Sequence, residues 1–255
     1  MTTTATSDIQ VSDIARIGHR EAMEITAVEN QRLLDLLNDL SAADWLMQTD
    51  CTRWDVRALV VHLIGSAQAQ ASPVEFARQV LAGRKLTAQI GGTHWVDGIN
   101  ESQIRARRSL QANDIPECWA ATSAAALRAR VRMPAPVRRL RLLPLGAPSG
   151  WKPLSYLFDI GFTRDVWMHR IDIARATRKS PQLTNDHDGR LIADIVAEWA
   201  GLHEEPFTLH LEGPAGGHYT ARGGAAPLTL DAVQFCRILS GRSPGRGVLR
   251  HALPL

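Results

Sequence analysis

The sequence has little cysteine, few aromatic residues and no long apolar run. Its three cysteines, Cys51, Cys118 and Cys236, are odd in number and share no short spacing, which excludes a disulfide framework and a Cys-x-x-Cys site. The longest apolar run, residues 58–65, is interrupted by His62 and is far shorter than the ~18 residues needed to span a bilayer. Residues 1–8 lack the features of a signal or transit peptide. We therefore expect a cytoplasmic protein with no membrane partner.

The sequence also has little lysine and almost no net charge. Of its 29 cationic residues only Lys85, Lys152 and Lys179 are lysine, and the cations exceed the 26 acidic residues by three. An excess this small is weak support for nucleic-acid binding. Six arginines within fourteen residues lack interleaved aromatic residues, which favours a solvated basic patch: Arg128, Arg130, Arg132, Arg138, Arg139 and Arg141. We expect no nucleic-acid partner; a weaker alternative is that the patch attracts an anionic substrate or a thiol cofactor.

The length and the hydrophobic pattern predict a mainly α protein, α+β overall, with two domains. A composition with 45% hydrophobic residues excludes a disordered chain. A length of 255 residues is near the limit at which a single hydrophobic core either extends or divides into two. Helical spacing and Gly or Pro breaks predict helices at about 14–40, 54–71, 72–83, 96–110, 115–131 and 153–176. Thr52 and Asp55 fit a capping box before the second of these helices.

A change of pattern follows the turn-rich residues 180–189. Beyond them we predict a helix at 191–201, a strand at 207–211, a second short strand after the turn at 213–217, a helix at 229–239 and a last strand at 247–255. The predicted domains are therefore a helical bundle over residues 1–180 and a small α+β domain over residues 181–255.

Asp165 and His169 are the first candidates for chemistry. They lie one helical turn apart, about 6 Å along the axis, on a face that turns polar where a bundle helix should be apolar. A carboxylate and an imidazole at this spacing can reach one point, as metal ligands do. The alternative is a plain ion pair at the surface.

His62, on the second predicted helix, is the candidate third ligand. Three of its four neighbours one turn away are small, Ala58, Gly65 and Ser66, which leaves room for a metal and its ligand. The alternative is a core histidine that binds a backbone carbonyl.

Two stretches of the sequence resemble signatures of a known family. Residues 51–63, CTRWDVRALVVHL, and residues 163–172, TRDVWMHRID, are similar to the two signatures of the mycothiol-dependent maleylpyruvate isomerase family, within the wider DinB-like superfamily. The segments 96–101 and 235–242 fit the intervening and closing parts of the same family. Both signatures occur in order and about 100 residues apart, so the resemblance covers most of the chain.

The resemblance implies a DinB-like four-helix bundle that binds a divalent metal, usually zinc. Carried over by position, the metal ligands are His62, Asp165 and His169. The isomerase itself has Glu where Asp165 stands, and a carboxylate one methylene shorter shifts the metal or draws the helix closer. In the family an Arg of the small C-terminal domain is implicated in catalysis, and Arg237 and Arg242 both lie in the matching region. Arg242 also fits a cation at a helix C-terminus.

Other polar residues near these motifs have two interpretations each. Asp172 either orients a ligand or pairs with Arg175. Asn100 lines the pocket mouth or lies in a surface turn. We place Ser66, Asp172 and Asn100 around the site. Cys51 lies eleven residues before His62, about 16 Å away in a continuous helix, which makes it a poor source of the reacting thiol.

The resemblance implies an enzyme that uses a metal and mycothiol, a low-molecular-weight thiol, to attack an electrophilic small molecule. Loss of the thiol after bond rotation makes it an isomerase, and retention makes it a thiol S-transferase. The alternative is a non-catalytic protein that holds a small molecule in the bundle cavity. We expect a monomer or a dimer.

Overall fold

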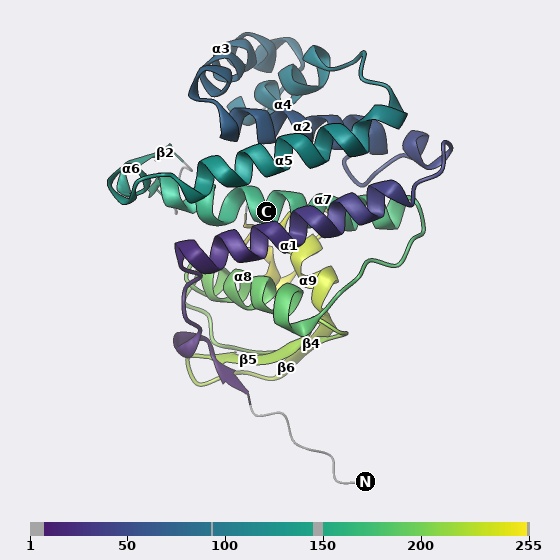
Figure 1. Cartoon of the computed structure of the whole chain (residues 1–255). Helices are drawn as coiled ribbons and strands as arrows, with labels where there is room; N and C mark the ends of the chain where they lie inside the picture. The colour runs from purple at the N-terminus through teal and green to yellow at the C-terminus, as the bar shows by residue number, and fades with distance from the viewer. Residues whose placement is uncertain (1–7, 93, 145–149, 254–255) are drawn as a thin grey trace. The chain divides into compact units, whose positions relative to one another are not determined.

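The computed structural model describes residues 8–92, 94–144 and 150–253 (Figure 1). By contacts between residues, the chain groups into two compact units. The helical unit comprises residues 19–143 and 153–181, and the sheet unit comprises the chain up to Gly18, residues 144–152 and everything from Gln182 onward. Domain limits at 1–180 and 181–255 remain a prediction. The sheet unit differs from the second of these domains because it includes residues from the beginning of the chain.

Four helices form the bundle of the helical unit: α1 (His19–Asn38), α2 (Val56–Ala71), α5 (Ile115–Val131) and α7 (Phe162–Ala176). The helix α2 packs against α5 and α7, and α1 packs against the same two helices (Figure 1). Two further helices, α3 (Pro73–Gln89) and α4 (Trp95–Ala106), pack on α2 and on each other. The shorter elements of this unit are η2 (Asp44–Leu46), η3 (Ala112–Asp114) and α6 (Ala135–Arg139). The strands β2 (Arg141–Pro144) and β3 (Trp151–Pro153) form a separate two-stranded sheet.

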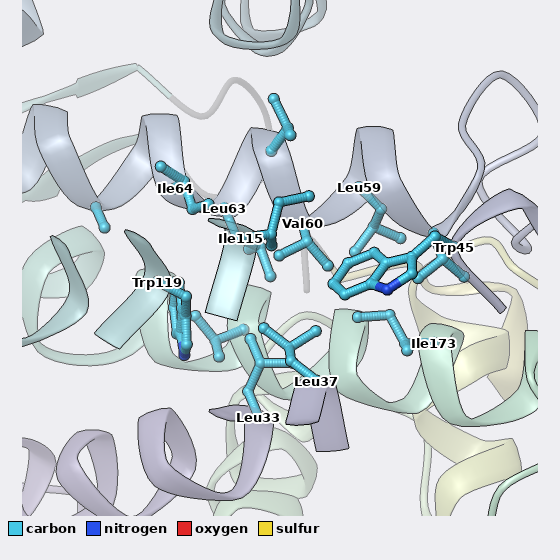
Figure 2. Close-up of a cluster of buried hydrophobic side chains, with 14 of the residues drawn as sticks. Leu33, Leu37, Trp45, Leu59, Val60, Leu63, Ile64, Ile115, Trp119 and Ile173 are labelled. Atoms are coloured by element: carbon cyan, nitrogen blue, oxygen red, sulfur yellow. The ribbon is translucent and has the colours of Figure 1, made fainter. Parts of the chain in front are cut away.

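The core of the bundle is a contiguous cluster of apolar side chains (Figure 2). The helix α2 contributes more of them than any other element, and α1 and α5 face it with Leu33, Leu37, Ile115 and Trp119, all at most 1% exposed. Burying a side chain of this size contributes about 1.5–3 kcal/mol. The core therefore holds α2 firmly, and α2 carries His62.

Polar contacts fix α7 against α1 and α5. Arg170 donates from Nε to Glu29 Oε1 at 2.6 Å, and neither side chain is more than 2% exposed. Arg130 on α5 is 2% exposed and donates to the Phe158 carbonyl at 2.6 Å and to the hydroxyls of Thr26 and Thr163 at 3.0 and 2.9 Å. The prediction that Arg130 belongs to a solvated patch was therefore wrong, because hydroxyl and carbonyl acceptors replace its water.

The sheet unit is built on a four-stranded mixed sheet in the order β1-β5-β4-β6. Its strands are β1 (Ile9–Gln10), β4 (Phe207–Glu212), β5 (Gly217–Ala221) and β6 (Pro227–Asp231). The β4–β5 pair is antiparallel, whereas β1 runs parallel to β5 and β6 runs parallel to β4. The unit also contains η1 (Val11–Asp13), η5 (Asn185–Gly189), α8 (Arg190–Ala200), α9 (Ala232–Leu239) and η6 (Gly247–Arg250).

One face of this sheet is apolar and is covered by α8 and α9 (Figure 1). Phe207, Leu209 and Leu211 alternate along β4 with more exposed residues, as a strand with one buried face requires. Trp199 of α8 lies with its ring centroid 4.8 Å from that of Phe207 and 5.3 Å from that of Phe235 on α9. The opposite face carries polar side chains, His210 among them.

The predicted fold class is confirmed, whereas several element boundaries differ. The helix predicted to end near Gly83 runs to Gln89 as α3, because Gly83 lies where α4 crosses it: a Cβ there would be 2.6 Å from the Ile99 nitrogen. Asp55 is itself the N-cap of α2, accepting from the Ala58 nitrogen at 2.7 Å, so the Thr52 capping box was wrong.

The remaining differences concern strands and helix types. The predicted helix 229–239 is split into β6 and α9, and Asp231 caps α9. The predicted last strand contains a 3-10 turn, η6, and its final residues 254–255 lie outside the described part. The long helix predicted from Pro153 begins as a π-helical segment, η4 (Tyr156–Gly161), before α7. Within the described residues, no helix is long and apolar enough to cross a membrane.

Candidate metal centre

Helices α2 and α7 bring the three predicted ligands together. His62 Nε2 lies 3.5 Å from Asp165 Oδ2, and His169 Nε2 lies 3.4 Å from Asp165 Oδ1. One ligand atom from each of the three residues lies within 4.8 Å of the others. His62 and His169 are 4% and 5% exposed, whereas the Asp165 side chain is 31% exposed. The group is therefore buried on the imidazole side and open on the carboxylate side.

A chain of amides fixes the orientation of His62. Gln79 donates from Nε2 to the Glu75 carboxylate and to the Gly65 carbonyl, both at 2.8 Å, so its Oε1 is left to accept. Gln103 donates to that oxygen at 2.7 Å, and its own Oε1 lies 2.7 Å from His62 Nδ1. Nδ1 must therefore be the donor, which leaves Nε2 as the ring nitrogen that faces Asp165.

Gly65 makes this chain of amides possible. It lies on α2 one turn after His62, and a Cβ at that position would be 2.6 Å from the Gln103 Cβ. The absence of a side chain lets α4 approach α2 closely enough for Gln103 to reach His62. The small neighbours of His62 thus admit a supporting side chain, which the sequence pattern alone did not identify.

His169 is held in the same way by a carboxylate. Its Nδ1 lies 3.0 Å from Asp172 Oδ2, and Asp172 is completely buried. An ionised carboxylate accepts only, so Nδ1 donates and Nε2 again faces Asp165. Arg175, the alternative partner of Asp172, pairs with Asp50 at 3.3 Å.

The charges of the group reinforce one another. Burial raises the pKa of Asp165, but the imidazoles of His169 and His62 outweigh that effect and hold this pKa well below its usual range. Burial likewise lowers the pKa of His169, but Asp165, and then Asp172, raise it well above its usual value. The carboxylate therefore stays ionised and attracts positive charge to the point where the three side chains meet.

The donor set fits a divalent metal ion. His62 Nε2 is a buried atom with no hydrogen-bond partner among the described residues, although its Nδ1 is fully engaged. A buried polar atom left unpaired is costly unless something binds it. Two imidazole nitrogens and one carboxylate, each imidazole held through its other nitrogen, form the ligand set typical of a catalytic zinc site.

Residues 51–54 close one side of the group. The Trp54 ring lies 5.1 Å from the His62 ring and 6.3 Å from the His169 ring, between centroids. Cys51 Sγ lies 3.8 Å from Asp172 Oδ2. The 16 Å separation expected for Cys51 was therefore wrong, since the chain before Asp55 turns back rather than continuing the helix. Cys51 nevertheless contacts Asp172, the carboxylate that holds His169 Nδ1.

The other predicted site residues lie at different places. Ser66 is buried on α2 and lines, with Gln70 and Arg130, a cavity of about 10 Å³, the space of one water molecule. Asn100 is half-buried on α4, one turn before Gln103. Arg237 is buried on α9, and Arg242 follows that helix; both belong to the sheet unit. A catalytic role for either arginine remains a prediction.

Comparison with known proteins places the chain in a family. Residues 26–174 match the model of the mycothiol maleylpyruvate isomerase N-terminal domain, a match that contains all three ligand candidates. The chain belongs to this family. The shared fold extends beyond the matched domain. Two solved structures each align with 92% of this chain, and the alignment includes 92% of the residues of each of those structures.

Those structures are both titled as mycothiol-dependent maleylpyruvate isomerase. One is 16% identical to this chain; the other, a histidine-to-alanine mutant, is 15% identical, and both have a TM-score of 0.57. At this identity they show a shared fold. No curated protein matches the chain.

Proposed function

We propose that this protein is a divalent-metal-dependent enzyme that activates mycothiol for addition to an electrophilic small molecule. The observation that carries the proposal is the convergence of two imidazole Nε2 atoms on one carboxylate, with each Nδ1 held by a buried acceptor. Asp165, His62 and His169 would hold the metal, most plainly zinc. Such a metal supplies a Lewis acid that favours the thiolate, the nucleophilic form of a thiol.

The surrounding residues prepare this site for a ligand that enters from outside. Gln103 and Asp172 orient the two imidazoles, and Trp54 excludes water from one side. The exposed edge of Asp165 leaves the route by which a thiol and its partner reach the site. The thiol itself comes from solution in this proposal, because the Cys51 thiol is directed to Asp172, which holds His169 Nδ1.

The chemistry is then decided by the fate of the sulfur atom. The thiolate forms a carbon–sulfur bond to the electrophilic carbon, and the electron pair moves to the adjacent group. If rotation about the new single bond is followed by loss of the thiolate, the product is an isomer of the substrate. If the adjacent carbon is instead protonated, the product is a stable thioether. The names of the two solved structures favour isomerisation, and we predict that Arg237 or Arg242 stabilises the negative charge.

Elemental analysis of the purified protein tests the metal. We expect about one divalent ion per chain in the bundle centre, lost in His62→Ala and in His169→Ala. His19→Ala is a matched control, because His19 also pairs with a carboxylate of the helical unit, Asp159 at 2.8 Å, but outside the site. Full metal retention in both ligand variants would overturn the proposed centre.

Incubation of the metal-loaded protein with mycothiol and an electrophilic enoyl acid tests the reaction. Mass spectrometry detects the thioether expected of an S-transferase, and proton NMR detects the altered double-bond geometry, at unchanged mass, expected of an isomerase. A metal-free protein that still shows a thermal shift with mycothiol, but forms no product, would instead support the non-catalytic binding protein.

A further inference from the structure

A second group of potential metal ligands lies on the exposed face of the sheet unit. His210 on β4 and His218 on β5 are directly opposite each other in the antiparallel register. Because Leu209, Leu211 and Tyr219 point to the buried face, alternation directs both histidines outward. Their rings are stacked, with centroids 4.3 Å apart and planes 19° apart.

Asp8 completes the group from the next strand of the sheet. The parallel pairing of Ile9 with Tyr219 places Asp8 beside His218. Asp8 Oδ1 lies 3.8 Å from His218 Nδ1 and 3.9 Å from His210 Nε2. One carboxylate oxygen therefore faces one nitrogen of each ring.

These distances are too long for hydrogen bonds and suit a bridging ion. A hydrogen bond between nitrogen and oxygen is about 2.7–3.2 Å long, so Asp8 does not hold the imidazoles in that way. Ligand atoms about 2.0–2.2 Å from a zinc ion lie roughly 3.3–3.6 Å apart in a tetrahedron. The three atoms lie within 4.8 Å of one another, so side-chain rotations that bring them closer by at most about 1.5 Å close the set.

We propose that Asp8, His210 and His218 form a second, surface metal site, which binds a borderline divalent cation such as Zn²⁺ or Ni²⁺. Two imidazoles select these ions over Mg²⁺ and Ca²⁺, which prefer oxygen ligands. The side chains are 41%, 30% and 35% exposed, so water completes the coordination and exchanges freely. The site shares no residue with the candidate centre of the helical unit.

Retention of the untagged full-length chain on immobilised Ni²⁺ tests this site selectively. His62 and His169 are too buried to reach an immobilised chelate. We expect the unaltered protein to be retained, and His210→Gln and His218→Gln to elute at clearly lower imidazole concentration. His251→Gln is a matched control, because His251 also pairs with a carboxylate, Glu205 at 2.8 Å, and is 28% exposed. Elution of His210→Gln together with the unaltered protein would overturn the proposal.

Equilibrium dialysis of the chelator-treated protein against Zn²⁺ provides the second measurement. His210→Gln should bind one Zn²⁺ fewer per chain than the unaltered protein, and Asp8→Asn should weaken that ion at least about tenfold. The same stoichiometry in both proteins refutes the surface site. If the bundle centre fails instead, His169→Ala leaves the Zn²⁺ stoichiometry unchanged while His210→Gln still lowers it.

Discussion

Replacing Gln103 with leucine tests how the structure prepares His62. Gln103 is 4% exposed and makes two hydrogen bonds, one with His62 Nδ1 and one to Gln79 Oε1. Leucine fills a similar volume but can make neither. His62 then loses the acceptor that fixes its tautomer and ring orientation, and Gln79 keeps an oxygen without its donor.

The two losses have different sizes and different readouts. Removing the partner of a metal-binding histidine typically lowers metal affinity about 10- to 100-fold, or about 1.4–2.7 kcal/mol. Leaving the buried Gln79 oxygen unpaired lowers the free energy of unfolding by about 1–3 kcal/mol even without metal. Gln103→Glu separates them, because a carboxylate still accepts from His62 but cannot donate to Gln79. We expect this variant to keep most of the metal affinity and to lose the stability.

Competition for Zn²⁺ against a chromophoric chelator measures the affinity, and urea unfolding of the metal-free protein measures the stability. Arg105→Ala, on the exposed side of the same helix, is the control and should change neither quantity appreciably. A folded Gln103→Leu variant with unaltered Zn²⁺ affinity would refute the claim that the amide chain prepares His62.

Three other substitutions test the supports of the helical unit by denaturant unfolding. Hydrogen bonds from Arg78, together with Gln79 and Arg107, lower the pKa of Glu75 from 4.5 to about 2, so its stabilisation is present above pH 4.5 and lost as the pH falls toward 2. Glu75→Gln should cost about 1–2 kcal/mol at pH 7, after allowance for solvent screening, and nothing extra at pH 2; an equal cost at both pH values would contradict this. Arg130→Met should lower the free energy of unfolding by about 1–3 kcal/mol, since the Phe158 carbonyl loses its donor. An unchanged free energy of unfolding would mean that the cost of burying the Arg130 guanidinium equals the stabilisation from its hydrogen bonds. Gly83→Ala should cost about 1–3 kcal/mol, because the new methyl group meets the α4 backbone, whereas Gly18→Ala, with open space around it, should not.

The candidate metal ligands could be predicted from the sequence, but the residues that orient them could not. Helical spacing alone places Asp165 and His169 one turn apart. Gln103 and Gln79 are separated by 24 residues and lie on α4 and α3, whose approach depends on Gly83, while Gly65 lets α4 approach α2. A periodic pattern describes one helix at a time and contains no information about which helices touch. Small residues beside His62 were the available signal, and they indicated space without indicating what fills it.

The fold was predicted best where local and tertiary preferences agree. The helix α5 matches its predicted limits, 115–131, because apolar spacing and Pro116 near its start point to the same element. The strands β1 and β6 were missed because each is short and lies at a sheet edge, where alternation covers few residues. Arg130 was misplaced because burial of a cation depends on acceptors supplied by distant segments.

The pairing of β1 with β5 has a consequence for synthesis. Ile9 and Gln10 are made about 200 residues before their partners, Tyr219 and Thr220. The helical unit is complete in the chain by residue 181, so it can fold on the ribosome while β1 still waits for its neighbour. Closing a loop of about 200 residues costs only slightly more entropy than closing one of 100. The first strand of the sheet is therefore unpaired until β5 has been made, and a fragment beginning at residue 181 would leave the edge of β5 unpaired.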